Sequence, residues 1–330
     1  MTAILCDRDL PAIQHHLRHA ANPTQVQQWL QVRPYRAYRD LAGNWLAIAL
    51  AIALVATYPV WWTIVLAFLI VGTRQYALFI LAHDAIHYSL HPHRQVNDNL
   101  ARWGAYGPMF MALEDARRNH LLHHRYAGTA DDPDRYIHTL SGKNDPIAFL
   151  LFCSGLATFG KTVLKVTPFG KLRSPSPSRD RGSVSKALQD YLNTRRPVFV
   201  CQALIFSVFL FLPTPWWLYL VLWIAPIYFL VFVPDEIRAF CDHAVIADDR
   251  AGDRQRLVTF CPSFLEAMVF SPHQMNYHAE HHLWPAIPHY NLPKAHRWVK
   301  LQPEVTLRYS YLRFLWQVTR SLPLKMEDSK

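Results

Sequence analysis

The sequence predicts an all-α integral-membrane protein in which four transmembrane helices form two hairpins that carry a cytosolic helical cap. Hydrophobic residues make up 51% of the 330 residues. Two runs without a charged residue, Trp45–Thr73 and Pro197–Val233, are each longer than one crossing of the membrane needs. Prolines interrupt both runs, at Pro59 and at Pro213 and Pro215, which divides each run into two helices.

The lengths of the divided runs match single membrane crossings. A hydrocarbon core of about 30 Å is spanned by about 20 helical residues. Tryptophan pairs next to both interruptions, Trp61–Trp62 and Trp216–Trp217, suit the headgroup layer. We therefore expect spans at about 43–60, 62–82, 197–212 and 216–234.

Basic residues flank the two runs, whereas the turns within them carry no charge. Arg33, Arg36 and Arg39 precede the first run, and Arg195 and Arg196 precede the second. Positive flanks favour the cytoplasmic side, which places both termini and the middle segment there. The expected parts are a cytosolic N-terminal segment, a membrane domain and a cytosolic C-terminal tail, at 1–40, 41–300 and 301–330.

The segment between the hairpins contains one short apolar run and one polar stretch. Ile147–Gly160 is too short for a span and predicts an interfacial or re-entrant helix. Residues 161–186 are basic and rich in serine and proline, which is typical of a flexible cytosolic loop.

Composition narrows the class of partner and the compartment. The net charge of +10 favours an anionic membrane surface or an acidic protein over nucleic acid, because the basic residues flank apolar runs. The five cysteines form no CxxC pair, so we expect neither a disulfide framework nor a cysteine metal site. Residues 1–40 are polar and do not resemble a signal peptide.

Three histidine clusters are the strongest functional signal. They are His83-Asp84-Ala85-Ile86-His87, His120-Leu121-Leu122-His123-His124 and His278-Ala279-Glu280-His281-His282. Residues i, i+3 and i+4 share one helix face, so three short helices can present eight imidazoles to one point. Eight imidazoles exceed what one ion takes, which favours two metals, and imidazole alone does not choose among Zn, Cu, Fe and Ni. Isolated histidines are expected to be surface or packing residues: His15, His16, His19, His91, His93, His138, His289 and His296.

These clusters resemble the three histidine boxes of the membrane fatty-acid desaturase superfamily. The family pattern is HxxxH, HxxHH and HxxHH around two helical hairpins, and the chain matches all three in order. Two extensions are also similar to the family. They are His124-Arg125-Tyr126 followed by Asp131-Asp132-Pro133-Asp134, and His282-Leu283-Trp284-Pro285 followed by Asn291-Leu292-Pro293.

The resemblance implies a histidine-ligated di-iron site in the cap. Matching positions give nine iron ligands: His83, His87, His120, His123, His124, His243, His278, His281 and His282. Some relatives have an asparagine four residues before the histidine that matches His243. Ala239 stands there in this chain, which leaves water or an open coordination position.

Several residues near the boxes are expected to support the site. Metal-bound histidines usually donate their second N–H to a carboxylate or carbonyl, so Asp84, Asp242, Asn276 and Glu280 are expected to orient ligands, with capping or solvation as the alternative for the acids. His273 is a weaker candidate for the same role. Arg74 lies inside the second span about 13 Å from His83 along a helix, too far for metal chemistry. It is expected to snorkel, to pair with another helix or to mark a substrate tunnel.

The resemblance implies an O2-dependent enzyme that introduces a C=C bond into a fatty acyl chain. Hydroxylation or ketolation of a carotenoid or another lipid is an alternative that the boxes do not exclude. Electrons would come from an external, ferredoxin-like donor, because the sequence has no dinucleotide fingerprint and no His-Pro-Gly-Gly haem motif. A membrane metal transporter or haem protein is disfavoured because the clusters flank the expected spans.

Overall fold

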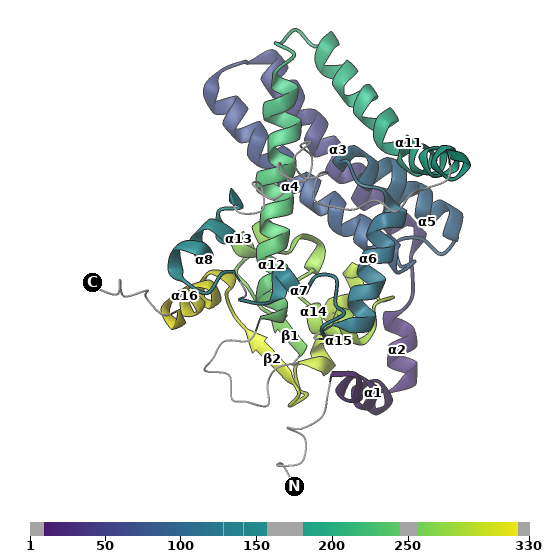
Figure 1. Ribbon diagram of the computed structural model, residues 1–330, viewed down its shortest axis with the longest axis vertical. Coiled ribbons are helices and arrows are strands. Elements are labelled where there is room, and N and C mark those ends of the chain that lie inside the picture. Colours follow the sequence, from purple (N-terminus) through teal and green to yellow (C-terminus); the bar gives the residue numbers. More distant parts are fainter. Residues whose placement is uncertain (1–9, 128, 141, 157–180, 245–256, 323–330) are drawn as a thin grey trace.

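The computed structural model describes residues 10–127, 129–140, 142–156, 181–244 and 257–322, with the backbone alone for 181–188. Long helices fill the upper half of Figure 1, and short helices with a two-stranded sheet fill the lower half. The chain begins with α1 (Leu10–Ala20) and α2 (Pro23–Trp29), which lie in the lower half.

Four helical segments are long and apolar enough to cross a membrane. They are α3 (Pro34–Thr57), α4 (Trp61–Ile86), the Gln189–Phe211 part of α11 (Arg181–Phe211), and Leu220–His243. The last segment joins the π-helical turns η3 (Leu220–Ile224) and η4 (Ile227–Phe232) to α12 (Val233–His243). Pro226, which lies between η3 and η4, has no N–H to donate and crowds the preceding turn, and π turns accommodate such a break.

The helix ends differ from the expected ones at two places that matter. α4 continues to Ile86, so His83 lies within its last turn rather than after the helix. α11 begins at Arg181, inside the segment 161–186 that was expected to be a loop, and residues 161–180 lie outside the described part of the chain.

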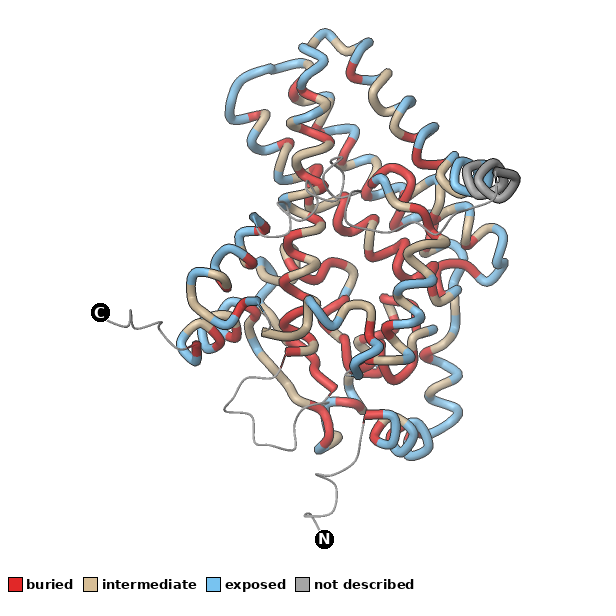
Figure 2. The backbone as a smooth tube through the Cα atoms, in the orientation of Figure 1, coloured by how far each residue is buried: buried red, intermediate tan, exposed pale blue. Residues whose placement is uncertain are grey.

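The outer surface of the long helices is apolar. Leu50, Leu204 and Phe211 are 61%, 64% and 89% exposed, and exposed residues follow the outer sides of the upper helices in Figure 2. α3 packs against α4, and α4 packs against η3 and η4, around a core that contains Val71 and Trp223. Apolar side chains therefore cover both the inside and the outside of this half, as expected for helices surrounded by lipid.

The remaining helices divide between the two halves. They are α5 (Arg94–Ala101), η1 (Arg102–Tyr106), η2 (Gly107–Met109), α6 (Leu113–Tyr126), α7 (Arg135–His138), α8 (Pro146–Cys153), α13 (Phe264–Phe270), η5 (Pro272–Gln274), α14 (His278–Leu283), η6 (His289–Asn291), α15 (Leu292–Val299) and α16 (Tyr311–Ser321). Of these, α5, η1 and η2 pack beside the long helices, and the others form the lower half. The short helix α8 lies where a short apolar helix was expected.

The structure contains a small parallel sheet that the all-α prediction did not include. β1 (Leu257–Phe260) pairs with β2 (Val305–Arg308), with Leu257 opposite Val305. Strands of four residues are too short for a reliable alternating pattern. After β2, the side chains of Phe314 and Val318 in α16 are buried in one cluster with Phe240, so this helix packs against the rest of the described chain.

Candidate metal centre

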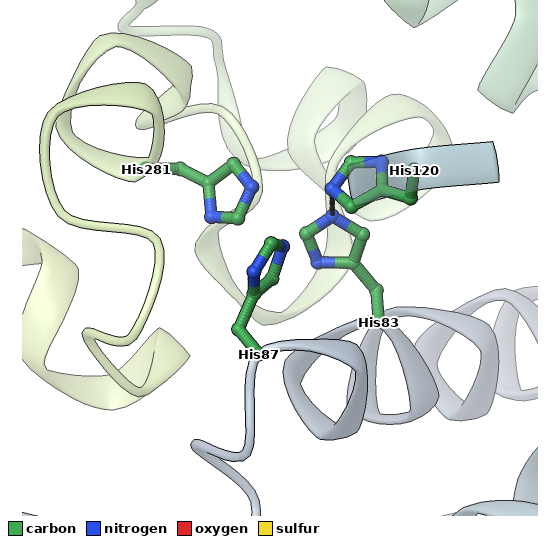
Figure 3. A group of neighbouring side chains, drawn as sticks. All are labelled: His83, His87, His120 and His281. Atoms are coloured by element: carbon green, nitrogen blue, oxygen red, sulfur yellow. Dashed lines mark hydrogen bonds between the residues drawn. The ribbon is translucent and has the colours of Figure 1, made fainter. Parts of the chain in front are cut away.

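The histidine boxes meet in the lower half of the molecule, where three helices approach one another. His83 lies in the last turn of α4, and His87 caps the end of that helix. α6 carries the second box and α14 the third. Figure 3 shows His83 and His87 from α4 facing His120 from α6 and His281 from α14.

Five histidines form a first group: His83, His87, His120, His124 and His281. The Nε2 atom of His120 lies 2.8 Å from Nε2 of His83 and 2.9 Å from Nε2 of His124. Nε2 of His124 lies 2.9 Å from Nε2 of His281. Ligand atoms of His83, His87, His120 and His281 all lie within 4.8 Å of one another.

Five histidines also form a second group: His123, His138, His243, His278 and His282. Ligand atoms of His123, His243 and His282 lie within 4.8 Å of one another. Nε2 of His278 is 2.8 Å from Nε2 of His243, and the ring of His138 is centred 4.1 Å from that of His243. His243, which was placed near the boxes by resemblance alone, thus lies among box histidines.

The boxes do not point to one place, contrary to the single convergence expected from their spacing. His120 and His124 belong to the first group, whereas His123 belongs to the second. Likewise, His281 lies in the first group, and His278 and His282 in the second. Neighbouring residues project about 100° apart around a helix of 3.6 residues per turn, so one box can supply two adjacent sites.

The nitrogen atoms are arranged as metal ligands and not as a hydrogen-bond network. In a neutral imidazole, Nε2 carries either one hydrogen or one lone pair, so Nε2 of His120 cannot form two well-directed hydrogen bonds to other Nε2 atoms at once. Two ligands at right angles on an ion with bonds of about 2.1 Å lie about 3 Å apart, close to the observed separations. Buried ring nitrogens of His83, His87, His278 and His282 have no hydrogen-bond partner among the described residues, and for His282 this holds for both nitrogens. These residues fit a pair of imidazole-bound metal ions.

Burial keeps these rings neutral and ready to bind metal. The pKa of His87 falls to about 3 because burial disfavours the charged form. Burial, followed by repulsion from neighbouring imidazoles, also holds the pKa values of His120, His278, His281 and His282 well below their usual range. A neutral imidazole is the form that a metal binds.

Asp132 contacts two histidines of the second group, and neither this contact nor the position of His138 was expected from the sequence. Its Oδ1 accepts a hydrogen bond from Nδ1 of His123 at 3.0 Å, and its Oδ2 lies 3.3 Å from Nδ1 of His138. Burial alone would raise the pKa of Asp132, but the hydrogen bonds from His123 and His138 outweigh it and keep that pKa well below its usual range. Nε2 of both rings stays available for metal. The available signal was an aspartate eight residues after the second box and six residues before a histidine.

The four expected supporting residues have varied partners. Asp242 Oδ2 accepts from Nη1 of the buried Arg238 at 2.7 Å and lies 3.6 Å from Nδ1 of His278. The other three contact residues outside the boxes. Asp84 accepts from His289, Glu280 accepts from Thr259 and His296, and Asn276 donates to the Phe260 carbonyl. The residue next to a ligand in the sequence points to another side of the helix. Asp84 and Glu280 therefore do not contact the box histidines beside them.

A third buried cluster lies beside the first group, but its hydrogen bonds argue against metal binding. The ring of His289 donates from Nδ1 to Asp84 at 2.8 Å and from Nε2 to Asp40 at 3.2 Å. Burial alone would lower its pKa, but the two carboxylates outweigh burial and raise the pKa to about 9. With both nitrogens protonated, His289 offers no lone pair to a metal. The cluster is a buried ion pair that ties η6 to α3 and α4.

Comparison with known proteins identifies the family of this chain. A dihydrorhizobitoxine desaturase from Bradyrhizobium elkanii is 27% identical over 260 residues, which cover 76% of this chain and 72% of that protein. The family model for fatty acid desaturases matches residues 59–314, which contain all three histidine boxes as well as His138 and His243. The chain therefore belongs to the fatty acid desaturase family and is a membrane oxidoreductase of that superfamily.

Proposed function

We propose that this chain is an O2-dependent, di-iron lipid desaturase that introduces a C=C bond into a fatty acyl chain. The observation that carries the proposal is the division of ten buried or half-buried histidines into two adjacent groups of five. The family generally binds iron, and removal of hydrogen from an unactivated methylene requires a redox metal. When bound, two irons would supply the activation of O2 and the removal of hydrogen from two neighbouring carbons.

The chain's own residues would hold that centre and exclude water from it. The nine histidines expected from the sequence, together with His138, are the proposed ligands. Asp132 would fix the ring orientations of His123 and His138, and Arg238 with Asp242 would do the same near His278. The long apolar helices would bring an acyl chain to the centre, where its position decides which carbon reacts.

We propose that the centre and both termini lie on the cytosolic side, with the turns near Pro59 and Pro213 on the other side. The basic flanks of the long helices support this orientation. Electrons would come from an external, acidic, ferredoxin-like protein, which the net charge of +10 on this chain would attract.

Expression in a host that lacks similar activity tests the function. Total lipids and pigments are profiled by mass spectrometry for the wild type, for His120→Ala and for His93→Ala, which changes a histidine outside both groups. We expect new unsaturated acyl chains with the wild type and His93→Ala, and none with His120→Ala. If a carotenoid or another lipid gains oxygen while acyl chains stay unchanged, the enzyme is a hydroxylase or ketolase and the proposal is wrong.

A further inference from the structure

A cavity of about 610 Å³ opens between the long helix α4 and the segment from β1 to α14. Arg74 and Ala77 of α4 form one wall, and Met268, His273, Asn276 and Tyr277 lie among the residues opposite. Its volume is in the range of small-molecule sites. Beside it, Phe264 and Leu265 at the start of α13 are 80% and 67% exposed, which suits a helix lying at the surface of a bilayer.

Arg74 is the charged side chain among the described residues that line this cavity. Its nearest recorded partner is the neutral Asn44, with Nη1 3.5 Å from Oδ1, and no carboxylate of the described chain pairs with it. A partly desolvated guanidinium without a counter-ion is costly inside a membrane helix. The cavity therefore presents a cation that an anionic ligand would stabilise.

The other polar groups of the cavity are neutral and suited to accompany an anion. Gln274 and Asn276 contribute amide groups, although Asn276 already donates one N–H to the Phe260 carbonyl, and His273 contacts Asn44 with Nε2 3.2 Å from Nδ2. Burial lowers the pKa of His273 to about 3, so this ring adds no charge. Amide donors next to one arginine, with no aspartate or glutamate among the described lining residues, form a set that selects a carboxylate or phosphate.

The cavity borders two of the helices that supply histidines to the metal-binding groups, α4 and α14. Tyr277 directly precedes His278, and Arg74 precedes His83 by nine residues, which is about 13 Å along a helix. A group held at Arg74 cannot itself react at the histidines. A long chain attached to it can reach them, so the anchor would set which carbon is presented.

We infer that this cavity binds the anionic head group of the lipid substrate, with Arg74 as its counter-ion and as a positioning residue for the reaction. The inference rests on the proposed function for the identity of the ligand as substrate. The acidic group follows from the cavity itself, and the long apolar chain follows from the proposed function. A free carboxylate and a phosphate share that chemistry, and the choice of probes separates them.

Equilibrium binding to purified protein in nanodiscs of neutral lipid tests the inference without turnover. The radiolabelled probes are oleate, methyl oleate and 1-oleoyl-lysophosphatidate. We expect one of the two anionic probes to bind at least about tenfold more tightly than methyl oleate, equivalent to about 1.4 kcal/mol. Preference for oleate identifies a carboxylate head group, and preference for lysophosphatidate identifies a phosphate.

Variants show whether Arg74 causes the preference. Arg74→Gln should lose the preference for the anionic probe while its iron content and thermal stability stay at the wild-type level, and Arg74→Lys should keep part of it. Arg297→Gln removes an exposed arginine elsewhere on the molecule and should bind like the wild type. Equal affinity of the wild type for all three probes, or an unchanged preference in Arg74→Gln, would overturn the inference. If Arg74→Gln is unstable, the binding of the three probes to the wild type and to Arg74→Lys still tests whether Arg74 causes the preference. Binding as expected without desaturation would instead refute the proposed function alone.

Discussion

At the scale of single residues, a substitution of Asp132 is expected to weaken iron binding. Its carboxylate accepts a hydrogen bond from Nδ1 of His123 and lies close to Nδ1 of His138. Asp132→Asn removes the charge and one acceptor oxygen, so we expect iron affinity to fall by about 10–100-fold. Iron retained during titration with a chelator measures this. Asp131→Asn, which changes the exposed neighbouring aspartate, is the control, and equal retention by both variants would contradict the assigned role.

His138 and His243 are expected to behave like box histidines. His243→Ala, His138→Ala and His281→Ala should each lose iron and activity, because each removes an imidazole from a group of five. His93→Ala should retain both, since that residue precedes α5 outside the groups. Metal analysis of purified variants decides the matter. Two irons per chain and full activity in His138→Ala would show that this ring only packs against its neighbours.

His289 should make stability depend on pH. Its pKa is about 9 in the folded protein against about 6.5 when unfolded, because Asp84 and Asp40 favour its charged form, with Arg39 and His273 also close to this cluster. The stabilisation, on the order of 3 kcal/mol at most, is present below pH 6.5 and is lost as pH rises through 9. Thermal unfolding in detergent should therefore show a decline between pH 6.5 and 9 that His289→Gln reduces. The same decline in both proteins would refute this.

At the scale of helices, α4 and η4 pack closely at Gly72. A Cβ atom added there would lie 2.6 Å from Cβ of Leu230, an atom that cannot move without its backbone. Gly72→Ala should therefore destabilise the protein by about 1–3 kcal/mol. Gly43→Ala in α3 is the matched control, because no atom lies within 4 Å of its added Cβ, and it should be neutral or slightly stabilising. Thermal unfolding of both variants tests this, and equal effects would show that α4 and η4 are not so closely packed.

The sequence predicted the long helices better than the contacts of the metal centre. Uncharged runs broken by prolines gave four membrane-length segments, because apolar length is a strong local signal. β1 and β2 were missed because each has four residues and depends on a partner about 50 residues away for its hydrogen bonds. His138 and His289 were assigned to surface or packing because only tertiary structure brings Asp132 and Asp84 to them.

At the scale of the whole molecule, the proposed orientation in the membrane can be tested by cysteine labelling. Asp131→Cys lies after the second box, whereas Tyr58→Cys and Trp216→Cys lie at the two turns, and all three positions are exposed. In a background without accessible native cysteines, an impermeant reagent added outside intact cells should label only the two turn positions. Labelling of residue 131 from outside would reverse the orientation.

The measurement that tests the central claim most directly is the fate of deuterium in a fatty acid supplied under ¹⁸O₂. Desaturation removes two vicinal deuterium atoms from a perdeuterated chain and leaves no ¹⁸O in it, whereas hydroxylation replaces one deuterium and adds ¹⁸O. The account predicts the first result, dependent on iron and absent in His120→Ala. Incorporation of ¹⁸O into the chain, or loss of deuterium that persists in His120→Ala, would contradict it.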